Sequence, residues 1–530
     1  MALQFLQKNN MNDKKHILWV DDEVDLLRSH IIFLEEKGYH VTSVYSGEDA
    51  IDICLKEQID LVLMDEMMAG LDGLSTLKII KKDIPDLPII MVTKNEEEWL
   101  MNKAIAEKIS NYLIKPVNPN QVFIACKKIL DDAQIENEKN IKEFLSFYND
   151  IQNANYKNYD YNDWIKLNDK LCSWSLKLDD INDNTFKTMF SEQYVNINKL
   201  FQEFYLNNYK KWFLKNNDSP ILSNHLYDNI FLPILKSDKK LILIIIDCFR
   251  MDQWKKISSS LKNNFNIKEG SHFSIIPTAT PFARNSIFSG LMPSELKSTY
   301  PELWSKMFKE GKMNSYEDEL FLKKMRKEGI NKSYKYVKIS NFNEGKKFYN
   351  KINDYKNVDV LSIVVNFVDI LGHSRSESEI LKELIPNVSA YRNAIYNWFE
   401  NSWLNQCFVE FSNWNSEIIL TSDHGNVQVD KPAPVKADNQ ASIGVRYKYG
   451  RNLNVDKKKS FKIIKPEEYM LPSMDINTQY IVAKDSNYFI YKNEYHKFVN
   501  LYKESFQHGG ISLEEVIVPL IKMKNKNEKK

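Results

Sequence analysis

The sequence predicts an α/β protein in three parts. These are a doubly wound N-terminal domain over residues 11–130, a central helical bundle over 131–235 and a second α/β domain over 236–530. In the first and last parts, short apolar runs end in acidic side chains and alternate with helical patterns, which is typical of parallel sheets covered by helices. Between them, the stretch from Asn120 to Asp218 contains neither glycine nor proline, which favours long helices.

Charge and cysteine content limit the class of protein. Lys plus Arg number 72 against 71 for Asp plus Glu, so no overall charge bias indicates a nucleic acid or membrane partner. The five cysteines have no Cys-x-x-Cys spacing, which argues against a disulfide framework and a zinc ribbon. The N-terminal segment from Met1 to Asn10 does not look like an export signal, and no apolar stretch has membrane length. We therefore expect a cytoplasmic protein with reduced thiols.

Each apolar run of the first part is followed by a polar residue that can bind a metal ion or take part in a reaction. The runs 16–20, 61–64, 89–92 and 112–114 lead to Asp21 and Asp22, to Asp65, to Thr93 and to Lys115, respectively. Because the carboxyl ends of parallel strands meet at one edge of a sheet, these side chains should converge. Asp21, Asp22 and Asp65 would form an acidic pocket suited to Mg²⁺, which offsets charge repulsion when a carboxylate attacks a phosphoryl donor.

This arrangement resembles the response-regulator receiver domain over the whole segment. The resemblance implies that Asp65 accepts a phosphoryl group from a sensor histidine kinase and that Lys115 pairs with a phosphoryl oxygen. It also implies that Thr93 hydrogen-bonds to that group and moves, drawing Tyr112 inward. A cis peptide bond is expected before Pro116. A receiver-shaped scaffold without phosphoacceptor activity is the alternative, but such scaffolds usually lack one of these residues.

The central part shows apolar residues at helical spacing, such as Ile141, Phe144, Leu145 and Tyr148. Its aromatic stripes are more typical of a core or a dimer contact than of a ligand platform. The polar stretch 149–163 is expected to be a loop between helices. A relay between the two α/β domains would lie in this part, either as helices that swing or as a dimer interface.

In the last part, three strand-like runs end in potential metal ligands. The run 241–246 leads to Asp247, 361–368 leads to Asp369 with His373 four residues later, and 416–422 leads to Asp423 and His424. A further strand-like run, 273–277, leads to Thr278 and Thr280, and His508 lies in a glycine turn near the C-terminus. Carboxylates combined with imidazoles suit zinc or manganese. Taken alone, the tripeptide Asp423-His424-Gly425 is better explained as a tight turn.

The ordered ligand set resembles the two-metal signature of the alkaline phosphatase superfamily, and its setting, roughly residues 235–522, resembles the PglZ branch. The resemblance implies two Zn²⁺ ions. One would be held by Asp247, Thr280, Asp423 and His424. The other would be held by Asp369, His373 and His508.

Thr280 is the predicted nucleophile. Pro281 fits the first turn of a helix, so Thr280 would be the N-cap, where a phosphate meets free N–H groups. Plain N-capping is the structural alternative, and Thr278 is the second candidate nucleophile. Arg284, four residues after Thr280, could fork onto a phosphoryl oxygen or lie at the surface.

Two further groups of charged residues have open roles. Arg250 and Asp252 could support the metal ligands or form a solvated helix start. The basic stretch 431–454 could embrace a polyanionic substrate or be a solvated insertion; its cations include Lys436, Arg446, Lys448 and Arg451. The charged tail 522–530 is expected to be disordered.

The domain order resembles the PorX family of response regulators, which is associated with type IX secretion. This resemblance implies a phosphorylation-dependent homodimer whose output is a zinc-dependent phosphodiesterase acting on nucleotides or oligonucleotides. Thr280-Pro281-Phe282-Ala283-Arg284 does not match the sulfatase motif, and a threonine nucleophile resembles the phosphodiesterase branch. The competing interpretation is a binding protein that docks on a sigma factor or secretion regulator, with a structural or vestigial metal site. Direct DNA binding is a weaker alternative, because no basic recognition helix is evident.

Overall fold

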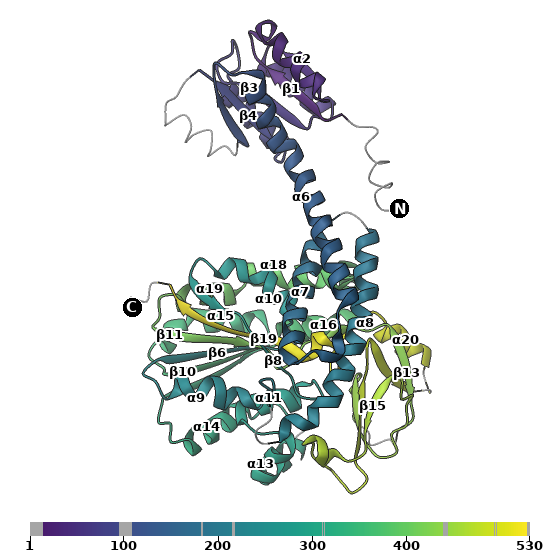
Figure 1. Ribbon diagram of the computed structural model, residues 1–530. Coiled ribbons are helices and arrows are strands. Elements are labelled where there is room, and N and C mark those ends of the chain that lie inside the picture. The colour runs from purple at the N-terminus through teal and green to yellow at the C-terminus, as the bar shows by residue number, and fades with distance from the viewer. Residues whose placement is uncertain are drawn as a thin grey trace. The chain divides into compact units, whose positions relative to one another are not determined.

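The computed structural model describes residues 14–94, 109–181, 184–214, 218–309, 311, 313–437, 442, 444–491, 493 and 495–526 (Figure 1). The chain divides into two compact units, Met1–Phe147 and Tyr148–Lys530, referred to below as the N-terminal unit and the C-terminal unit. The segment from Met1 to Asn10 and residues 527–530 of the charged tail lie outside the described residues. The expectation of disorder was wrong for residues 522–525, which belong to a paired strand. The predicted domain boundaries at 130/131 and 235/236 stay predictions.

The N-terminal unit is a five-stranded parallel sheet in the order β2-β1-β3-β4-β5, as expected for a doubly wound domain. Its strands are β1 (His16–Val20), β2 (His40–Val44), β3 (Leu61–Asp65), β4 (Ile89–Thr93) and β5 (Asn111–Ile114). Alternate residues of β1 enter two different cores, since Ile17 and Trp19 pack in one and Leu18 and Val20 in the other. The helices that contribute to these cores include α2 (Arg28–Glu36), α3 (Gly47–Lys56) and α4 (Gly73–Asp83). Burial on both faces explains why these strands are continuously apolar.

The middle of the chain is helical, as predicted, and is built from few, long helices: α6 (Pro119–Asn153), α7 (Tyr161–Asp180) and α8 (Asn184–Asn208). The expected loop at 149–163 is shorter, because α6 continues to Asn153. In the C-terminal unit the aromatic side chains of α7 and α8 form a core, in which Trp164 packs edge-on against Phe201. The Tyr205 hydroxyl donates to the Ser274 carbonyl at 2.9 Å, which fixes α8 to the segment that follows Phe273.

The C-terminal unit contains a seven-stranded sheet in the order β7-β19-β11-β6-β10-β9, with β8 pairing with β19. Its strands are β6 (Lys240–Ile246), β7 (Phe265–Lys268), β8 (Ser271–Phe273), β9 (Tyr334–Ile339), β10 (Val360–Val365), β11 (Ser416–Thr421) and β19 (Ile517–Asn525). Strands β11, β6, β10 and β9 are parallel, whereas β19 is antiparallel to β11. The predicted strand at 273–277 was wrong in its extent, because β8 ends at Phe273 and Pro277 has no N–H to donate to a ladder.

Helices cover both faces of this sheet (Figure 1). The even-numbered residues of β6, such as Ile244, pack with one set, which includes α10 (Met251–Leu261), α15 (Phe342–Asn350), α18 (Val388–Glu400) and α19 (Trp403–Phe411). The odd-numbered residues, such as Leu243, pack with the other set, which includes α9 (Leu232–Leu235), α11 (Thr280–Ser289), α12 (Pro293–Thr299), α13 (Pro301–Lys309) and α14 (Glu317–Lys327). The carboxyl ends of the parallel strands are therefore the part of the sheet left for a site.

Smaller β elements follow β11 in the chain. They are β12 (Val427–Gln428), β13 (Lys431–Val435), β14 (Tyr447–Gly450), β15 (Ser460–Ile463), β16 (Gln479–Ala483), β17 (Asn487–Tyr491) and β18 (Phe506–Gln507). The predicted basic stretch 431–454 overlaps β13 and β14, and its residues 438–441 and 443 lie outside the described part. Arg446 is fully buried against Glu515 at 2.7 Å, and Lys448 is 2% exposed, so the solvated alternative is wrong for these two cations. Among the described residues, no helix has the length and hydropathy needed to cross a membrane.

Candidate functional site

Three neighbouring parallel strands bring the predicted ligands to one edge of the C-terminal sheet. Strand β6 lies between β10 and β11, and Asp247 follows β6 directly. Asp423 and His424 follow β11, while Asp369 and His373 lie on α16 (Phe367–Glu377), which starts two residues after β10. The convergence follows from the strand order and the shared direction of these strands.

The first group of side chains surrounds the Thr280 hydroxyl. Thr280 Oγ1 lies 3.4 Å from Asp247 Oδ1 and 3.2 Å from His424 Nε2. His424 Nε2 lies 3.8 Å from Asp247 Oδ1 and 3.7 Å from Asp423 Oδ2. Ligand atoms of one tetrahedral zinc ion are expected about 3.3–3.7 Å apart, given zinc–ligand bonds of about 2.0–2.2 Å. The donor types and spacings therefore fit one zinc ion.

The second group is centred on Asp369. Its Oδ1 lies 3.2 Å from His373 Nε2 and 3.5 Å from His508 Nε2. The i, i+4 spacing of Asp369 and His373 places both on one face of α16. The His508 ring stacks on the His424 ring with centroids 4.3 Å apart, so the two groups are in direct contact. This donor set also fits a divalent ion.

The electrostatics of the site favour bound cations. Burial raises the pKa of Asp247 to about 6, because the nearby Arg284 only partly offsets the loss of water and the charges of Asp423 and Asp369. Burial lowers the pKa of His424, and it lowers the pKa of His508 to about 4, so both imidazoles are neutral near pH 7. Neutral imidazoles with free lone pairs are the form that binds metals.

Arg284 is fully buried behind the carboxylates. Its Nε donates to Asp423 Oδ2 at 3.0 Å, and its Nη2 pairs with both Asp247 Oδ2 and Asp423 Oδ2. Nη1 lies 3.7 Å from Glu317 Oε1. Helical spacing indicated the correct face for Arg284 but not its depth, and its predicted contact with a phosphoryl oxygen stays a prediction.

The two threonines before α11 have different environments. Ala279 is the N-cap and Thr280 the first helical residue, so the N-cap prediction was wrong by one position. Thr278 Oγ1 donates to the Gly510 carbonyl at 2.8 Å and accepts from the Gly509 N–H at 3.2 Å. The Thr278 hydroxyl therefore has a structural role, whereas the Thr280 hydroxyl faces the ligands.

Sequence reasoning missed Cys248 and gave Arg250 no definite role. Cys248 has φ of 63°, and its thiol donates to Asp369 Oδ1 at 3.2 Å. Arg250 is bound by Asp252, and Arg392 on α18 holds the same carboxylate at 2.7 Å. The one signal that the sequence offered for these residues is that they closely follow Asp247. A positive φ and a pairing between distant helices leave no pattern in the sequence. The solvated alternative for Arg250 and Asp252 is wrong, since both are 5% exposed.

The receiver residues converge in the N-terminal unit. Oxygens of Asp21, Asp22 and Asp65 lie within 4.8 Å of one another. Lys115 Nζ lies 2.8 Å from Asp21 Oδ2 and 2.9 Å from Asp65 Oδ2. Burial raises the pKa of Asp65 although Lys115 opposes the shift. The expected cis peptide bond between Lys115 and Pro116 is confirmed.

The two predicted switch residues lie on neighbouring strands. Thr93, at the end of β4, is fully buried and donates a hydrogen bond to the Glu66 carboxylate. Tyr112, on β5, is half-buried. Their predicted roles in a receiver switch stay predictions.

Comparisons with protein families place a domain on each part of the chain. The profile described as the BREX system PglZ alkaline phosphatase-like domain matches residues 226–523, more than half of the chain. The response regulator receiver domain matches residues 17–127, and the PorX response regulator linker domain matches residues 134–213. The three matches follow one another in the predicted order.

Curated relatives match shorter stretches. The probable transcriptional regulator ycf27 of Cyanidium caldarium is 31% identical over 166 residues, which are 30% of this chain and 66% of that protein. The transcriptional regulatory protein ResD of Bacillus subtilis is 32% identical over 124 residues, 23% of this chain and 51% of that protein. The chain thus spans about half to two thirds of the length of these relatives. A response regulator receiver domain protein from Methanospirillum hungatei is 28% identical, covers 23% of this chain and 99% of its own, and has a TM-score of 0.23.

Proposed function

The chain belongs to the PglZ alkaline phosphatase-like family and has the domain order of a PorX-type response regulator, and from this premise we propose that its output is zinc-dependent hydrolysis of phosphodiesters. The observation that carries the proposal is the position of the Thr280 hydroxyl, 3.2 Å from His424 Nε2 and 3.4 Å from Asp247 Oδ1. A nucleophile placed among metal ligands is the arrangement that this chemistry requires.

The ligands divide into two sets in this proposal. One ion would be held by Asp247, Thr280, Asp423 and His424. The other would be held by Asp369, His373 and His508. Bound zinc supplies Lewis-acid activation of the attacking hydroxyl and of the phosphoryl oxygens.

The residues of the chain position the reaction. Thr280 Oγ1 would form the new bond to phosphorus while the first alcohol leaves, and water would then cleave the resulting phosphothreonine ester. The hydrogen bond from Thr280 Oγ1 to Asp247 Oδ1 gives the hydroxyl proton a route away from the oxygen. Thr280 is the first residue of α11, where the positive end of the helix dipole favours a phosphoryl group. The resemblance to the phosphodiesterase branch supports a nucleotide or oligonucleotide diester as substrate.

A diesterase assay with metal analysis tests the proposal. The purified protein should contain about two zinc ions per chain and hydrolyse bis(p-nitrophenyl) phosphate. Thr280→Ala should lower kcat by about 1,000-fold or more with unchanged zinc content, since the nucleophile is lost. Thr278→Ala is the matched control and should keep most of the activity if the protein folds. A Thr280→Ala protein as active as its parent would remove Thr280 as nucleophile, and a zinc-loaded protein without diesterase activity would favour the binding-protein alternative.

The receiver would control this output. A sensor histidine kinase would phosphorylate Asp65 with Mg²⁺ bound by Asp21, Asp22 and Asp65, and the phosphorylated protein would form a homodimer in the cytoplasm and act in type IX secretion. BeF₃⁻ with Mg²⁺ should shift the parent protein towards the dimer in light scattering, whereas Asp65→Ala should not respond. Identical behaviour of the two proteins would contradict the switch.

A further inference from the structure

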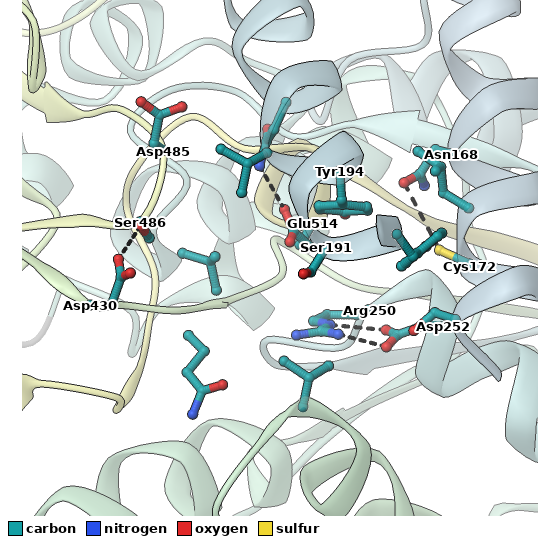
Figure 2. A pocket seen from close by; sticks show the side chains of 18 of the residues that line it. Asn168, Cys172, Ser191, Tyr194, Arg250, Asp252, Asp430, Asp485, Ser486 and Glu514 are labelled. Carbon is teal, nitrogen blue, oxygen red and sulfur yellow. Dashed lines mark hydrogen bonds and ion pairs between the residues drawn. The ribbon is translucent and has the colours of Figure 1, made fainter. Parts of the chain in front are cut away.

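A cavity of about 710 Å³ lies in the C-terminal unit, between helices α7, α8 and α10 and the turns next to β12 and β17 (Figure 2). Its volume is within the range of small-molecule sites, about 300–1,000 Å³. None of the predicted metal ligands lines it. The proposed function does not use this space.

The walls of the cavity combine apolar faces with one polar end. Leu171, Phe190, Met251, Val388 and Val427 supply apolar surface. Such surfaces suit the flat faces of a planar ligand. Figure 2 shows Tyr194, Glu514 and Arg250 gathered at one side, with Asp430, Asp485 and Ser486 on the opposite side.

The polar end has hydrogen-bonding capacity to spare. Glu514 Oε2 accepts a long bond of 3.4 Å from Asn198 Nδ2, and the carboxyl also bonds to the Ser512 side chain and to its own backbone N–H, which leaves lone pairs of the two oxygens for a ligand. Within the described part of the chain, no hydrogen bond reaches the Tyr194 hydroxyl. Both side chains are half-buried, and burial raises the pKa of each group.

Arg250 does not neutralise Glu514 by direct pairing. Its Nε and Nη2 bind Asp252 at 2.9 and 2.6 Å, and its Nη1 lies 3.5 Å from the Asn426 carbonyl. Arg392 shares Asp252 and also pairs with Asp179, so the two arginines and the two aspartates balance one another. Glu514 is left as a carboxyl that faces the cavity without a salt bridge among the described residues.

The other charges of the lining are mainly acidic. Asp430 accepts from Ser486 Oγ, Asp485 accepts from Gln202 Nε2 at 3.1 Å, and Glu504 is exposed. No ion pair within the described residues involves these three carboxylates, and Lys431 is the cation that lines the cavity besides Arg250. Repulsion from these carboxylates disfavours phosphates and other anions.

We propose that this cavity binds a planar ligand that presents two adjacent N–H donors, an amidine-type edge, to the Glu514 carboxyl. A carboxylate accepts two parallel N–H···O bonds from such an edge, while the apolar walls hold the faces of the ligand. This edge occurs in organic amidine and guanidine cations and in guanine-type bases. The acidic lining selects against the phosphorylated forms of such bases.

Calorimetric titration of the full-length protein with two probes of the same shape tests whether the cavity requires a ligand that carries a positive charge and an edge of two N–H donors. Benzamidine should bind, and benzoate, which has the same shape and the opposite charge, should bind at least about tenfold more weakly. Guanosine distinguishes the two classes of ligand. If guanosine binds more tightly than benzamidine, the ligand is a guanine-type base. If guanosine binds more weakly, the ligand is an organic cation. Equal affinity for benzamidine and benzoate, or no binding of benzamidine and guanosine, would overturn the proposal.

Variants locate the binding. Glu514→Gln keeps the shape of the side chain and should weaken benzamidine at least about tenfold, whereas the matched control Glu383→Gln, exposed on α17 (Glu379–Leu384), should leave it unchanged. Ser191 is exposed and lines the cavity, so Ser191→Trp should block both probes without affecting the core. Unaltered benzamidine binding in both cavity variants would place the probe elsewhere. The titration needs no zinc and no turnover, so its outcome is separate from that of the diesterase assay.

Discussion

The N-terminal and C-terminal units place the same types of side chain at the carboxyl ends of parallel strands, but these side chains are buried to different extents. Each gathers aspartates, one basic side chain and one threonine hydroxyl at the carboxyl ends of its strands. In the N-terminal unit the base is Lys115, whose side chain is 13% exposed, and Asp22 is exposed to solvent. In the C-terminal unit the base is Arg284, and the side chains of both Arg284 and Asp423 are 0% exposed.

This difference in burial is the one expected if the receiver site is a switch and the C-terminal site is fixed, as the proposed function requires. A lysine has one compact charge on a flexible stem and can exchange a carboxylate for a phosphoryl oxygen. An arginine that binds three carboxylates with a planar fork has no comparable freedom. We therefore expect changes in the C-terminal unit to affect stability strongly and equivalent changes in the receiver to affect it little.

The largest expected effect is the removal of Arg284. Arg284→Met leaves Asp247, Asp423 and Glu317 without their buried cation and should lower the free energy of unfolding of the metal-free C-terminal unit by about 3–5 kcal/mol. Lys115→Met in the receiver should cost less than Arg284→Met, because Lys115 pairs with two carboxylates rather than three and the neighbouring Asp22 is exposed to water. Urea unfolding in chelator, followed by tryptophan fluorescence, measures both. Equal losses in the two variants would show that burial does not distinguish the sites.

Metal removal should produce the next largest effect. Zinc at about 1,000 times its dissociation constant stabilises the folded protein by about 4 kcal/mol, so chelation should lower the melting temperature of the C-terminal unit. Magnesium at about ten times its dissociation constant gives only about 1.4 kcal/mol in the receiver. The matched control Asp247→Asn should lose most of the response to zinc and keep the response to magnesium. A chelator that leaves the C-terminal transition unchanged would contradict the metal assignment.

The same contrast shows what the sequence can and cannot predict. Apolar runs ending in Asp21, Asp65, Asp247 and Asp423 predicted both sheets and their site edges, because strand burial and strand direction leave a direct mark in the pattern. The partners of Arg284 left no such mark, since Glu317 comes from a helix 33 residues further on. Helical spacing predicts which face of a helix carries a side chain, but it does not predict how deeply that side chain is buried.

The remaining misses have similar causes. The extent of β8 and the N-cap of α11 each depend on local backbone geometry that differs by one or a few residues. Arg446 and Lys448 read as surface cations, yet they are buried by the small sheet that follows β11 in the chain. Interactions between distant segments therefore account for most of what the pattern could not predict.

A pH titration of stability sharpens the comparison. In the metal-free protein, burial raises the pKa of Asp247 from 3.8 to about 6. The native state therefore binds more protons than the unfolded state between these values, and stability falls as pH rises from about 4 to 6, by about 3 kcal/mol for this group. Asp247→Asn should remove this part of the pH dependence. Asp65→Asn should remove a smaller change of the same sign, because the pKa of Asp65 is also raised by burial but Lys115 opposes the shift.

Urea midpoints of the metal-free proteins at several pH values between 4 and 7 give these slopes. The difference between the parent and each variant isolates one carboxyl from all the others. An Asp247→Asn protein with the slope of its parent would mean that the charge of Asp247 is already balanced without metal.

The smallest expected effect is that of Glu66→Ala on the affinity for BeF₃⁻, and it follows from the different partners of the two threonine hydroxyls. Thr280 faces metal ligands directly, whereas the Thr93 hydroxyl donates to Glu66, a carboxylate that a phosphoryl group would have to displace as its partner. Glu66→Ala should therefore raise the affinity of the receiver for BeF₃⁻ about two- to fivefold, the equivalent of about 0.5–1 kcal/mol for one hydrogen bond. Fluorescence titration with Mg²⁺ present measures it. The double variant Glu66→Ala with Thr93→Ala should bind BeF₃⁻ no more tightly than Thr93→Ala alone. If the affinity still rises without the Thr93 hydroxyl, the effect comes instead from the lost negative charge beside Asp65.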